Sequence, residues 1–203
     1  MARGRAATYA VQQDAILQHA ARLFAERGFQ GTSMLELASA TGVSKALLYH
    51  YYEDKYQLLV AIAESHIDRL VAVVDEVNAR ATSDAARLQA LVERFVSEYA
   101  NARAHHQVLV QDIKYLDATD QSRIRDKERT VVRAFAEAIA AAHPALAQQA
   151  LGKPLAMLLF GMINWLFTWF RDDGALDYAR LSALVVAFAG GGLAAVATTA
   201  GEG

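Results

Sequence analysis

The apolar residues of the chain recur every three to four positions over most of its length, which is the period of an amphipathic helix and not that of a strand. In the first part of the chain such stripes cover about residues 11–27, 33–40 and 44–52, and a longer stripe follows over about 55–80. The pattern therefore predicts three short helices ahead of one long helix.

Residues that favour helix ends support these limits. Gly28 directly follows the first stripe, where glycine is a favoured C-cap. Ser33 stands three residues before Glu36, which is the spacing of a capping box, and Ser44 is a further N-cap candidate. Gly42 lies in the break between the second and third stripes, where a tight turn needs a positive φ. We expect two short helices joined at Gly42.

The remainder of the chain keeps the helical period. Stripes are predicted over about residues 85–104, 108–116, 120–143 and 154–171, and a last one begins at about 177. Prolines and polar turns separate these stripes, as expected of residues that stop or start helices. The predicted fold class is all-α, with about nine helices.

Composition narrows the classes of protein that the chain can belong to. Its 203 residues are 54% hydrophobic and 21% charged, which is enough to bury a sizeable core and excludes intrinsic disorder. Cysteine is absent, so disulfides, thiolate nucleophiles and cysteine-ligated zinc are excluded together.

Charge is distributed unevenly along the chain. The total formal charge is −2, but residues 1–55 carry six basic and five acidic side chains, whereas residues 56–203 carry fourteen and seventeen. The first part also holds His19 and His50. A polyanion is therefore expected to meet the N-terminal end of the chain.

Two stretches near the C-terminus contain no charged residue, namely residues 155–170 and 181–200. The first is shorter than the roughly 20 residues that cross a bilayer, and the second is only weakly apolar because it is rich in alanine and contains Gly190, Gly191 and Gly192. The alternatives are a membrane hairpin and two helices buried against a core and a partner, and we expect the second. The N-terminus lacks the apolar core of a secretory signal, so a cytoplasmic protein without membrane association is predicted.

Residues 32–58 have small, apolar and glycine residues at the positions where a helix-turn-helix requires them. Small Ala38 stands where two helices must approach closely, Gly42 supplies the turn, and apolar Val43 and Leu48 pack the second helix on the first. The second helix presents a mixture of small, polar and aromatic side chains suited to a major groove about 12 Å wide. These side chains are Ser44, Lys45, Ala46, Leu47, Tyr49 and His50.

This segment resembles the DNA-binding head of the TetR family of bacterial transcription regulators. The resemblance rests on the threonine-serine helix start and on Leu37-Ala38, Gly42-Val43-Ser44, Leu48-Tyr49-His50-Tyr51 and Lys55. The chain departs from the family pattern at Ala46, Leu47 and Tyr52, where glycine, threonine or alanine, and phenylalanine are usual. Leu47 in particular would read a thymine methyl group or no base at all.

The resemblance implies three groups of DNA-binding residues. Phosphate contacts are expected from Thr32, Ser33, Tyr49, His50 and Lys55. Base-edge contacts are expected from Ser44 and Lys45. Arg3 and Arg5 would reach a minor groove as an arm that orders on DNA. The alternatives are core packing for the tyrosine, solvated charges for the lysines, and a solvated tail for the arm.

The implied organisation is a DNA-binding head over residues 1–53 and a ligand-binding and dimerisation body over 54–203. One head reads too few base pairs for useful specificity, so a homodimer on palindromic double-stranded operator DNA is expected, with recognition helices roughly 34 Å or a small multiple apart. The two uncharged C-terminal helices are expected to pair with their symmetry mates in a four-helix interface, as the family resemblance also implies.

The resemblance further implies that the body binds a small hydrophobic effector that draws the protein away from DNA. The candidates for the pocket are aromatic and amide side chains at helical spacing, namely Phe95, Tyr99, Tyr115, Asn164, Trp165 and Trp169. Ordinary core or dimer packing is the alternative for the aromatic residues. A backbone partner would equally satisfy the asparagine.

The segment around Asn164-Trp165, with Trp169 and Arg171, also resembles a TetR subgroup that responds to acyl-CoA thioesters in fatty-acid, phenylacetate and sterol breakdown. An acyl-CoA effector would need cations for its phosphates. One predicted helix offers Arg123, Arg125, Lys127, Arg129 and Arg133. The alternative is a solvated face with local ion pairs to Asp126 and Glu128.

Enzyme motifs are not found in the sequence. Four histidines are candidates for metal ligands, but they lack metal-site spacing: His66, His105, His106 and His143. No phosphate loop or nucleophile elbow occurs in the sequence. No catalytic, metal or cofactor site is therefore predicted. The function predicted is a DNA-binding repressor released by its effector, and the alternative is a helical lipid or acyl-group binding protein with a vestigial head.

Overall fold

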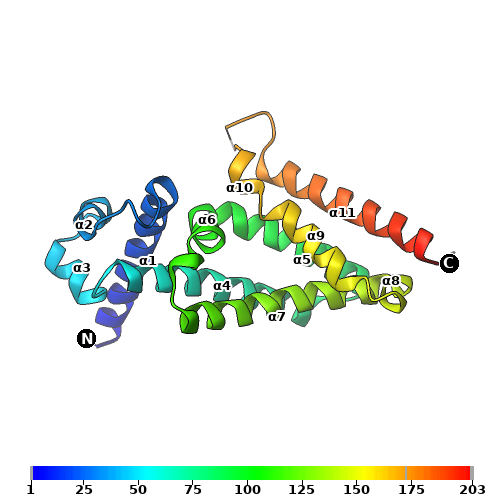
Figure 1. Ribbon diagram of the computed structural model, residues 1–203, viewed down its shortest axis with the longest axis horizontal. Coiled ribbons are helices and arrows are strands. Elements are labelled where there is room, and N and C mark those ends of the chain that lie inside the picture. The colour runs from blue at the N-terminus through cyan, green and yellow to red at the C-terminus, as the bar shows by residue number, and fades with distance from the viewer. Residues whose placement is uncertain (1, 172, 202–203) are drawn as a thin grey trace. The chain divides into compact units, whose positions relative to one another are not determined.

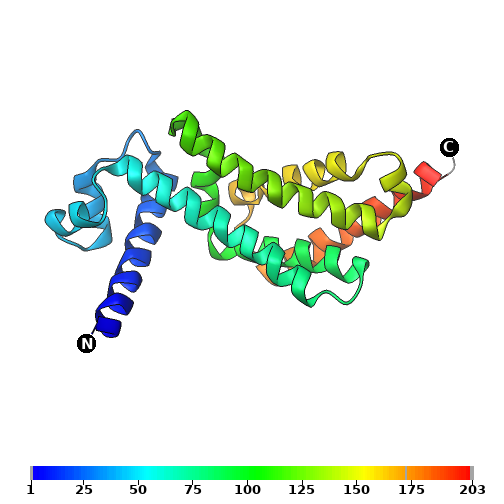
Figure 2. The ribbon, with the colours of Figure 1, turned by 90° about the horizontal axis from the view of Figure 1, so that it is seen from below.

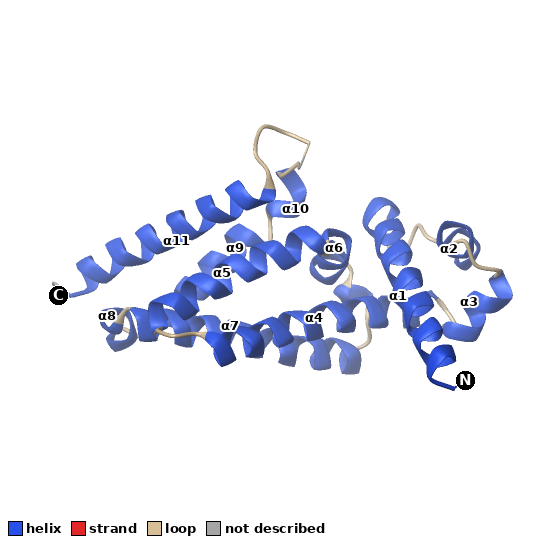
Figure 3. Ribbon diagram, turned by 180° about the vertical axis from the view of Figure 1, so that it is seen from behind, coloured by secondary structure: helices blue, strands red, loops and turns tan. Residues whose placement is uncertain are grey.

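The computed structural model describes residues 2–171 and 173–201, apart from the side chains of residues 2–8 and 10. Over this part of the chain the fold is entirely helical, with eleven α-helices and one short 3-10 turn (Figures 1 and 3). The elements are α1 (Ala2–Arg27), α2 (Met34–Thr41), α3 (Lys45–Tyr51), α4 (Lys55–Arg80), α5 (Asp84–Asn101), α6 (Arg103–Gln111), η1 (Ile113–Tyr115), α7 (Ala118–Ala142), α8 (Pro144–Gln148), α9 (Gly152–Ile163), α10 (Leu166–Trp169) and α11 (Tyr178–Gly201). The predicted all-α class is confirmed.

The chain forms two compact units that are not continuous in sequence. The first compact unit lies within Met1–Ile67 and Ala104–Ile124, and the second lies within Asp68–Arg103 and Arg125–Gly203. Helices α4 and α7 therefore each contribute residues to both units. The functional boundary predicted after residue 53 stays a prediction.

Helices α1 to α3 form the head, in which α2 packs on α1 and on α3 (Figure 2, blue to cyan). Their shared core consists of residues that the helical stripes brought to one face, among them Ile16, Phe24, Leu37 and Leu48, all fully buried. Burial of each such side chain stabilises the head by about 1.5–3 kcal/mol. The small residue Ala38 is buried where the helices meet, as the sequence predicted.

The predicted helix ends of the head are confirmed. Gly28 and Gly42 have positive φ values of 76° and 69°, and no other described glycine has a positive φ. The Ser33 hydroxyl accepts from the Glu36 backbone N–H and the Glu36 side chain accepts from the Ser33 backbone N–H, which is a complete capping box. Ser44 caps α3 by accepting from the Leu47 backbone N–H. Such a cap contributes about 1 kcal/mol.

The first compact unit also contains the beginning of α4, helix α6 and the beginning of α7. Tyr56 of α4 donates to Asp120 Oδ2 over 2.8 Å and accepts from the Asp117 backbone N–H over 3.0 Å. Gln107 of α6 donates to the backbone carbonyl of Ala25 in α1 over 2.9 Å. Polar contacts thus tie α6 and the start of α7 to the same unit as the head.

The core of the second compact unit is aromatic. Phe135 of α7 lies 4.8 Å, centroid to centroid, from both Phe95 of α5 and Phe160 of α9, edge to face in each case. Edge-to-face pairs add about 0.5–1.5 kcal/mol to the free energy of burial. Helix α11 packs mainly on α5, with smaller contacts to α8 and α9.

The uncharged stretch before Arg171 is broken, whereas the sequence predicted one helix. Helix α9 ends at Ile163, and the short α10 begins only at Leu166. The carbonyl groups freed near the break have partners, because Thr168 Oγ1 donates to Trp165 O over 2.7 Å and Arg103 donates to Phe167 O over 2.6 Å. An apolar period cannot reveal such a break, since both pieces contribute buried apolar residues, such as Ile163 and Leu166.

Helix α11 leaves most of its apolar surface open. By length and composition alone it is long and apolar enough to cross a membrane, and 17% of its most apolar window is buried. Its most exposed apolar side chain, Phe188, has 74% of its surface accessible, and Leu184 has 54%. Leu158 of α9 is similarly open at 71%. The two stretches predicted to form an interface therefore do present apolar faces.

Candidate nucleic-acid interface and effector region

Helix α3 carries the residues predicted to read DNA on an exposed face. Its only buried residue is Leu48, which anchors the helix to the head core. Lys45, Tyr49 and His50 are exposed, and Tyr49 has 43% of its surface accessible. The Lys45 ammonium lies 5.7 Å from the centroid of the Tyr49 ring, one helical turn away. The aromatic ring and the cation therefore share one outward surface.

Ser44 sits at the N-terminus of this helix. Its hydroxyl oxygen accepts from the Leu47 backbone N–H over 3.2 Å. A serine hydroxyl can donate while it accepts, so this cap leaves its hydrogen available to a base or phosphate oxygen. The position is exposed and suits the base-edge contact that the sequence predicts.

At the start of α2 a carboxylate already occupies the place predicted for a phosphate. Glu36 Oε2 accepts from both the backbone N–H and the hydroxyl of Ser33, over 2.8 and 2.7 Å. Arg27 donates to Glu36 Oε1 over 2.9 Å. The hydrogen bonds from Ser33, and secondarily the Arg27 charge, lower the pKa of Glu36 below its usual range. A phosphate at Ser33 must displace Glu36, and this contact stays a prediction.

Thr32 and Lys55 hold the loop between α1 and α2. Thr32 is 2% exposed, and its hydroxyl donates to Gly28 O over 2.9 Å. The Lys55 ammonium donates to the backbone carbonyls of Phe29, Gln30 and Thr32 over 3.0, 3.3 and 2.9 Å. An ammonium has three donors, so all of them are used. In this structure both side chains bond to the loop itself, and the direct phosphate contacts predicted for them stay predictions.

The inner side of α3 is braced against α1 by polar contacts. The Tyr51 hydroxyl donates to Gln12 Oε1 over 3.0 Å, and the Tyr51 ring lies 4.6 Å from that of Tyr9. Gln13 donates to the Tyr52 hydroxyl over 3.3 Å, and burial raises the pKa of Tyr52. The sequence did not single out Gln12 and Gln13, because each lies 39 residues from the tyrosine that it contacts.

The predicted N-terminal arm is only partly described. Helix α1 begins at Ala2, so the backbone that carries Arg3 and Arg5 is helical, where the sequence predicted an arm without structure. The side chains of Arg3 and Arg5 lie outside the described residues, and their contact with a minor groove stays a prediction.

The residues predicted to line an effector pocket lie in different surroundings. Phe95 and Tyr99 lie in the packed core of the second compact unit, 0% and 6% exposed, and burial raises the pKa of Tyr99. Trp165 and Trp169 are 60% and 55% exposed. Tyr115 belongs to the first compact unit, where its ring stacks on Phe29 at 5.4 Å.

Asn164, the last of these candidates, ends α9 at the break before α10. Its side-chain oxygen is buried and, among the described residues, has no hydrogen-bond partner. An unsatisfied buried amide oxygen costs about 1–3 kcal/mol, which marks a place where a donor from a ligand would be stabilising.

The basic residues of α7 lie on different faces of the helix and differ in their ion-pair partners. Arg123 is paired with Glu64 and Asp120, and Lys127 is paired with Asp68. Arg129 is paired with Asp126 on its own helix, as one of the predicted local pairs. Arg125, Arg129 and Arg133 line a groove of about 610 Å³ together with Lys153 of α9, which the sequence did not single out.

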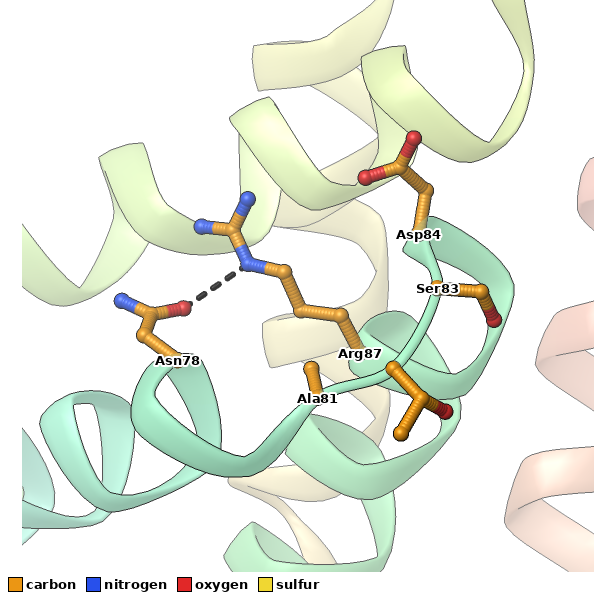
Figure 4. Close-up of a pocket in the computed structure, with 6 residues that line it drawn as sticks. Asn78, Ala81, Ser83, Asp84 and Arg87 are labelled. Atoms are coloured by element: carbon orange, nitrogen blue, oxygen red, sulfur yellow. Dashed lines mark hydrogen bonds between the residues drawn. The ribbon is translucent and has the colours of Figure 1, made fainter.

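A second surface hollow, of about 480 Å³, lies at the turn between α4 and α5 (Figure 4). Within it Arg87 Nε donates to Asn78 Oδ1 over 2.8 Å, and Ser83 caps α5 by accepting from the Ala86 backbone N–H. Asp84 supplies a negative charge at the same helix start. The hydrogen bond between Arg87 and Asn78 joins the end of α4 to the start of α5, and the Ser83 cap helps to hold the turn.

Two of the histidines are paired in the first compact unit. His66 Nε2 of α4 lies 3.3 Å from His106 Nδ1 of α6, and both side chains are 3% exposed. Burial, and then the neighbouring His106 and His105, lower the pKa of His66 to about 3. Among the described residues no group of three or more histidine, aspartate or glutamate side chains is arranged to hold a metal ion.

Comparison with known families assigns the two parts of the chain. Residues 16–62 match the model described as bacterial regulatory proteins, tetR family. Residues 81–193, more than half of the chain, match the model described as tetracyclin repressor-like, C-terminal domain. The first match contains the whole helix-turn-helix, and the second contains the groove and the start of α11.

Individual relatives agree with these matches. The HTH-type transcriptional activator FasR of Mycolicibacterium smegmatis is 36% identical over 80 residues, which cover 39% of this chain and 36% of FasR. A TetR-family regulator from Bordetella parapertussis is 29% identical with a TM-score of 0.81, over 87% of this chain and 92% of that one.

A further solved structure is AibR in complex with isovaleryl coenzyme A and operator DNA. It is 28% identical with a TM-score of 0.74, and the match covers 87% of this chain and 97% of AibR. The fold, the helix-turn-helix and both family matches lead to one conclusion: the chain belongs to the TetR family of bacterial regulatory proteins.

Proposed function

We propose that the protein is a ligand-responsive transcriptional repressor that binds palindromic operator DNA as a homodimer and is released by a small hydrophobic effector. The observation that carries this proposal is the outward face of α3, where Lys45, Tyr49 and Ser44 are exposed while Leu48 fixes the helix to the head. Such a face meets the requirement for a helix that enters a major groove. A cytoplasmic location follows from DNA as the partner.

The apolar faces of α9 and α11 support a dimer. Leu158 and Phe188 are 71% and 74% exposed, and apolar surface of this extent on two neighbouring helices marks an interaction site. A second copy of the chain offers the same two helices, so a twofold axis would bury both faces in a four-helix arrangement. The resulting spacing between the two copies of α3 would select the operator.

An acyl-CoA thioester is the proposed effector class. AibR, with 28% identity, has been solved with isovaleryl coenzyme A and operator DNA. In the present chain, the cationic groove on α7 and α9 and the unsatisfied Asn164 oxygen offer partners for phosphates and for a polar group. An effector that binds better to the form unable to engage DNA shifts the population away from the operator by no more than this difference in affinity.

DNA binding is tested by gel-shift titration with the DNA upstream of the protein's own gene. We expect Lys45→Ala and Tyr49→Ala to abolish binding while sedimentation shows the dimer unchanged. Arg80→Ala is the matched control, because it removes an exposed cation at the end of α4, far along the chain from α3. Affinity should fall steeply with salt. Unaltered binding by both α3 variants would contradict the assignment.

Effector coupling is tested separately by titrating isovaleryl coenzyme A with and without saturating operator DNA. Linkage requires a releasing effector to bind more weakly to the DNA-bound protein. Equal affinity in both titrations would favour the alternative of a helical acyl-group binding protein. Transcription from the same upstream DNA, measured with and without protein, shows whether the protein represses or activates.

A further inference from the structure

The groove between α7 and α9 gathers positive charge from two helices of the second compact unit. Arg125, Arg129 and Arg133 are spaced four residues apart along α7, so they lie along one face of that helix. Lys153 contributes a fourth cation from the first turn of α9. Only Arg129 of these four is paired with a carboxylate at ion-pair distance, namely with Asp126, among the described residues.

The same groove has an apolar side, and its two helices approach each other closely at one end. Val132, Ala136 and Met157 line it beside the cations. A Cβ atom added at Gly152 would lie 2.7 Å from the backbone oxygen of Ala136, so glycine lets α9 begin close against α7. The beginning of α9 carries no side-chain cap and no acidic residue in its first turn, so its positive end is also unneutralised.

One carboxylate, that of Glu128, interrupts the cationic lining of the groove. Glu128 is half-buried in the groove, and burial raises its pKa despite the charges of Arg125 and Arg129. A phosphate bound by the neighbouring cations would be repelled by the Glu128 carboxylate.

We propose that this groove binds the phosphate-bearing end of an amphipathic effector, with Arg125, Arg133 and Lys153 as the phosphate contacts and Val132 and Met157 as the apolar contacts. Arginine suits the bidentate recognition of phosphate oxygens, and lysine supplies a point charge. Arg123 and Lys127, which are on the same helix, are excluded because ion pairs to Glu64, Asp120 and Asp68 already engage them. The inference rests on the proposed function only in naming the bound molecule as the effector.

The chemistry recognised here is shared by coenzyme A and by free nucleotides, so the probes must separate them. Isothermal titration of the full chain without DNA would use coenzyme A, isovaleryl coenzyme A, ADP and isovaleryl pantetheine, which carries the acyl thioester without phosphates. We expect both coenzyme A probes to bind, with affinity that falls as salt rises. ADP binding as tight as that of coenzyme A would assign the site to nucleotides in general. No binding by any phosphate-bearing probe would overturn the proposal.

Variants then place the contacts. Arg125→Gln, Arg133→Gln and Lys153→Gln should each weaken coenzyme A binding about tenfold, as expected when one charge-assisted contact is lost. Lys127→Gln is the matched control, because it removes a cation from another face of the same helix, and it should leave affinity unchanged. Glu128→Gln should tighten binding severalfold, because it removes the one negative charge in the lining. Isovaleryl pantetheine should bind the wild type and the groove variants alike.

A triple variant combines Arg125→Gln, Arg133→Gln and Lys153→Gln. If its affinity for coenzyme A stayed at the wild-type value, the proposed site in the groove would be overturned. Circular dichroism of each variant checks that the helices are retained. Failure of the regulator proposal is distinguishable from this outcome, since it would appear as absent operator binding by the wild-type protein while the groove variants still lose coenzyme A affinity.

Discussion

The head and the second compact unit hold their candidate functional side chains in different ways. In the head, the caps at Ser33 and Ser44 and the Lys55 ammonium bond to groups of the same small unit, so the face of α3 is already formed without DNA. In the second unit, Phe95 is locked in an aromatic core, whereas Trp165 is exposed. The difference teaches that local contacts hold the candidate DNA-reading face of α3 in place, whereas the aromatic candidates for an effector pocket are divided between a packed core and an open surface.

Removal of the central aromatic ring tests whether the second unit is held by packing. Phe95→Ala should lower the free energy of unfolding by about 4 kcal/mol, because it leaves a cavity between Phe135 and Phe160. Urea denaturation followed by circular dichroism measures this loss. Phe95→Leu should cost far less. Equal effects of the two variants would mean that the core is not tightly packed. The second compact unit would then not differ from the head in the way described above.

Loss of the loop anchor tests the head. Lys55→Met should lower the free energy of unfolding by about 3 kcal/mol, because three backbone carbonyls lose a charged donor. Lys45→Met is the matched control, since it removes an exposed lysine from α3, and it should change stability by no more than about 0.5 kcal/mol. Operator affinity should fall in both variants. A stability loss confined to Lys45→Met would reverse the roles assigned to the two lysines.

Acid should weaken the first compact unit through its buried histidine pair. The folded pKa of His66 is about 3, against 6.5 for a free side chain, so the unfolded chain takes up the proton first. Stability from this group is complete above about pH 6.5 and is lost as the pH falls towards 3, by about 2 kcal/mol at pH 5. Urea denaturation at pH 7.5, 6 and 5 measures it. His66→Leu should flatten this dependence, and an unchanged slope would assign it elsewhere.

The smallest expected changes in stability come from two serines, and they separate helix capping from DNA contact. Ser33→Ala and Ser44→Ala should each lower stability by about 1 kcal/mol, because each removes one N-cap. Ser44→Ala should also weaken operator binding beyond this loss, whereas Ser33→Ala should not while Glu36 occupies the start of α2. Thermal melts measure the stability of both variants, and gel shifts on the same samples measure their operator affinity. Equal losses of operator affinity in the two variants would contradict the different roles of Ser33 and Ser44.

Sequence reasoning succeeded where the physical cause is local. The capping box at Ser33, the positive φ at Gly42 and the cap at Ser44 each depend on residues within four positions, and all were predictable from spacing. The helical stripes likewise identified the buried faces of α1 and α4, since period alone determines which residues share a side.

The contacts that sequence reasoning missed join residues far apart in the chain. Lys55 meets carbonyls 23 to 26 residues away, and its charge gave no hint that it would bond to a loop. Tyr115 was grouped with Phe95 by its aromatic character, but it stacks on Phe29 instead. The cations of α7 became distinguishable only when partners on α4, such as Asp68, were known.

The three consecutive glycines of α11 have a consequence for how the protein responds in a cell. No atom outside the helix lies within 4 Å of a Cβ built at Gly190, Gly191 or Gly192, so these three positions make no close side-chain contact within a single chain. Each glycine lowers helix stability by about 1 kcal/mol relative to alanine. In the proposed homodimer a second copy could pack closely against these positions, so occupancy of the operator would rise with the number of copies that the cell makes.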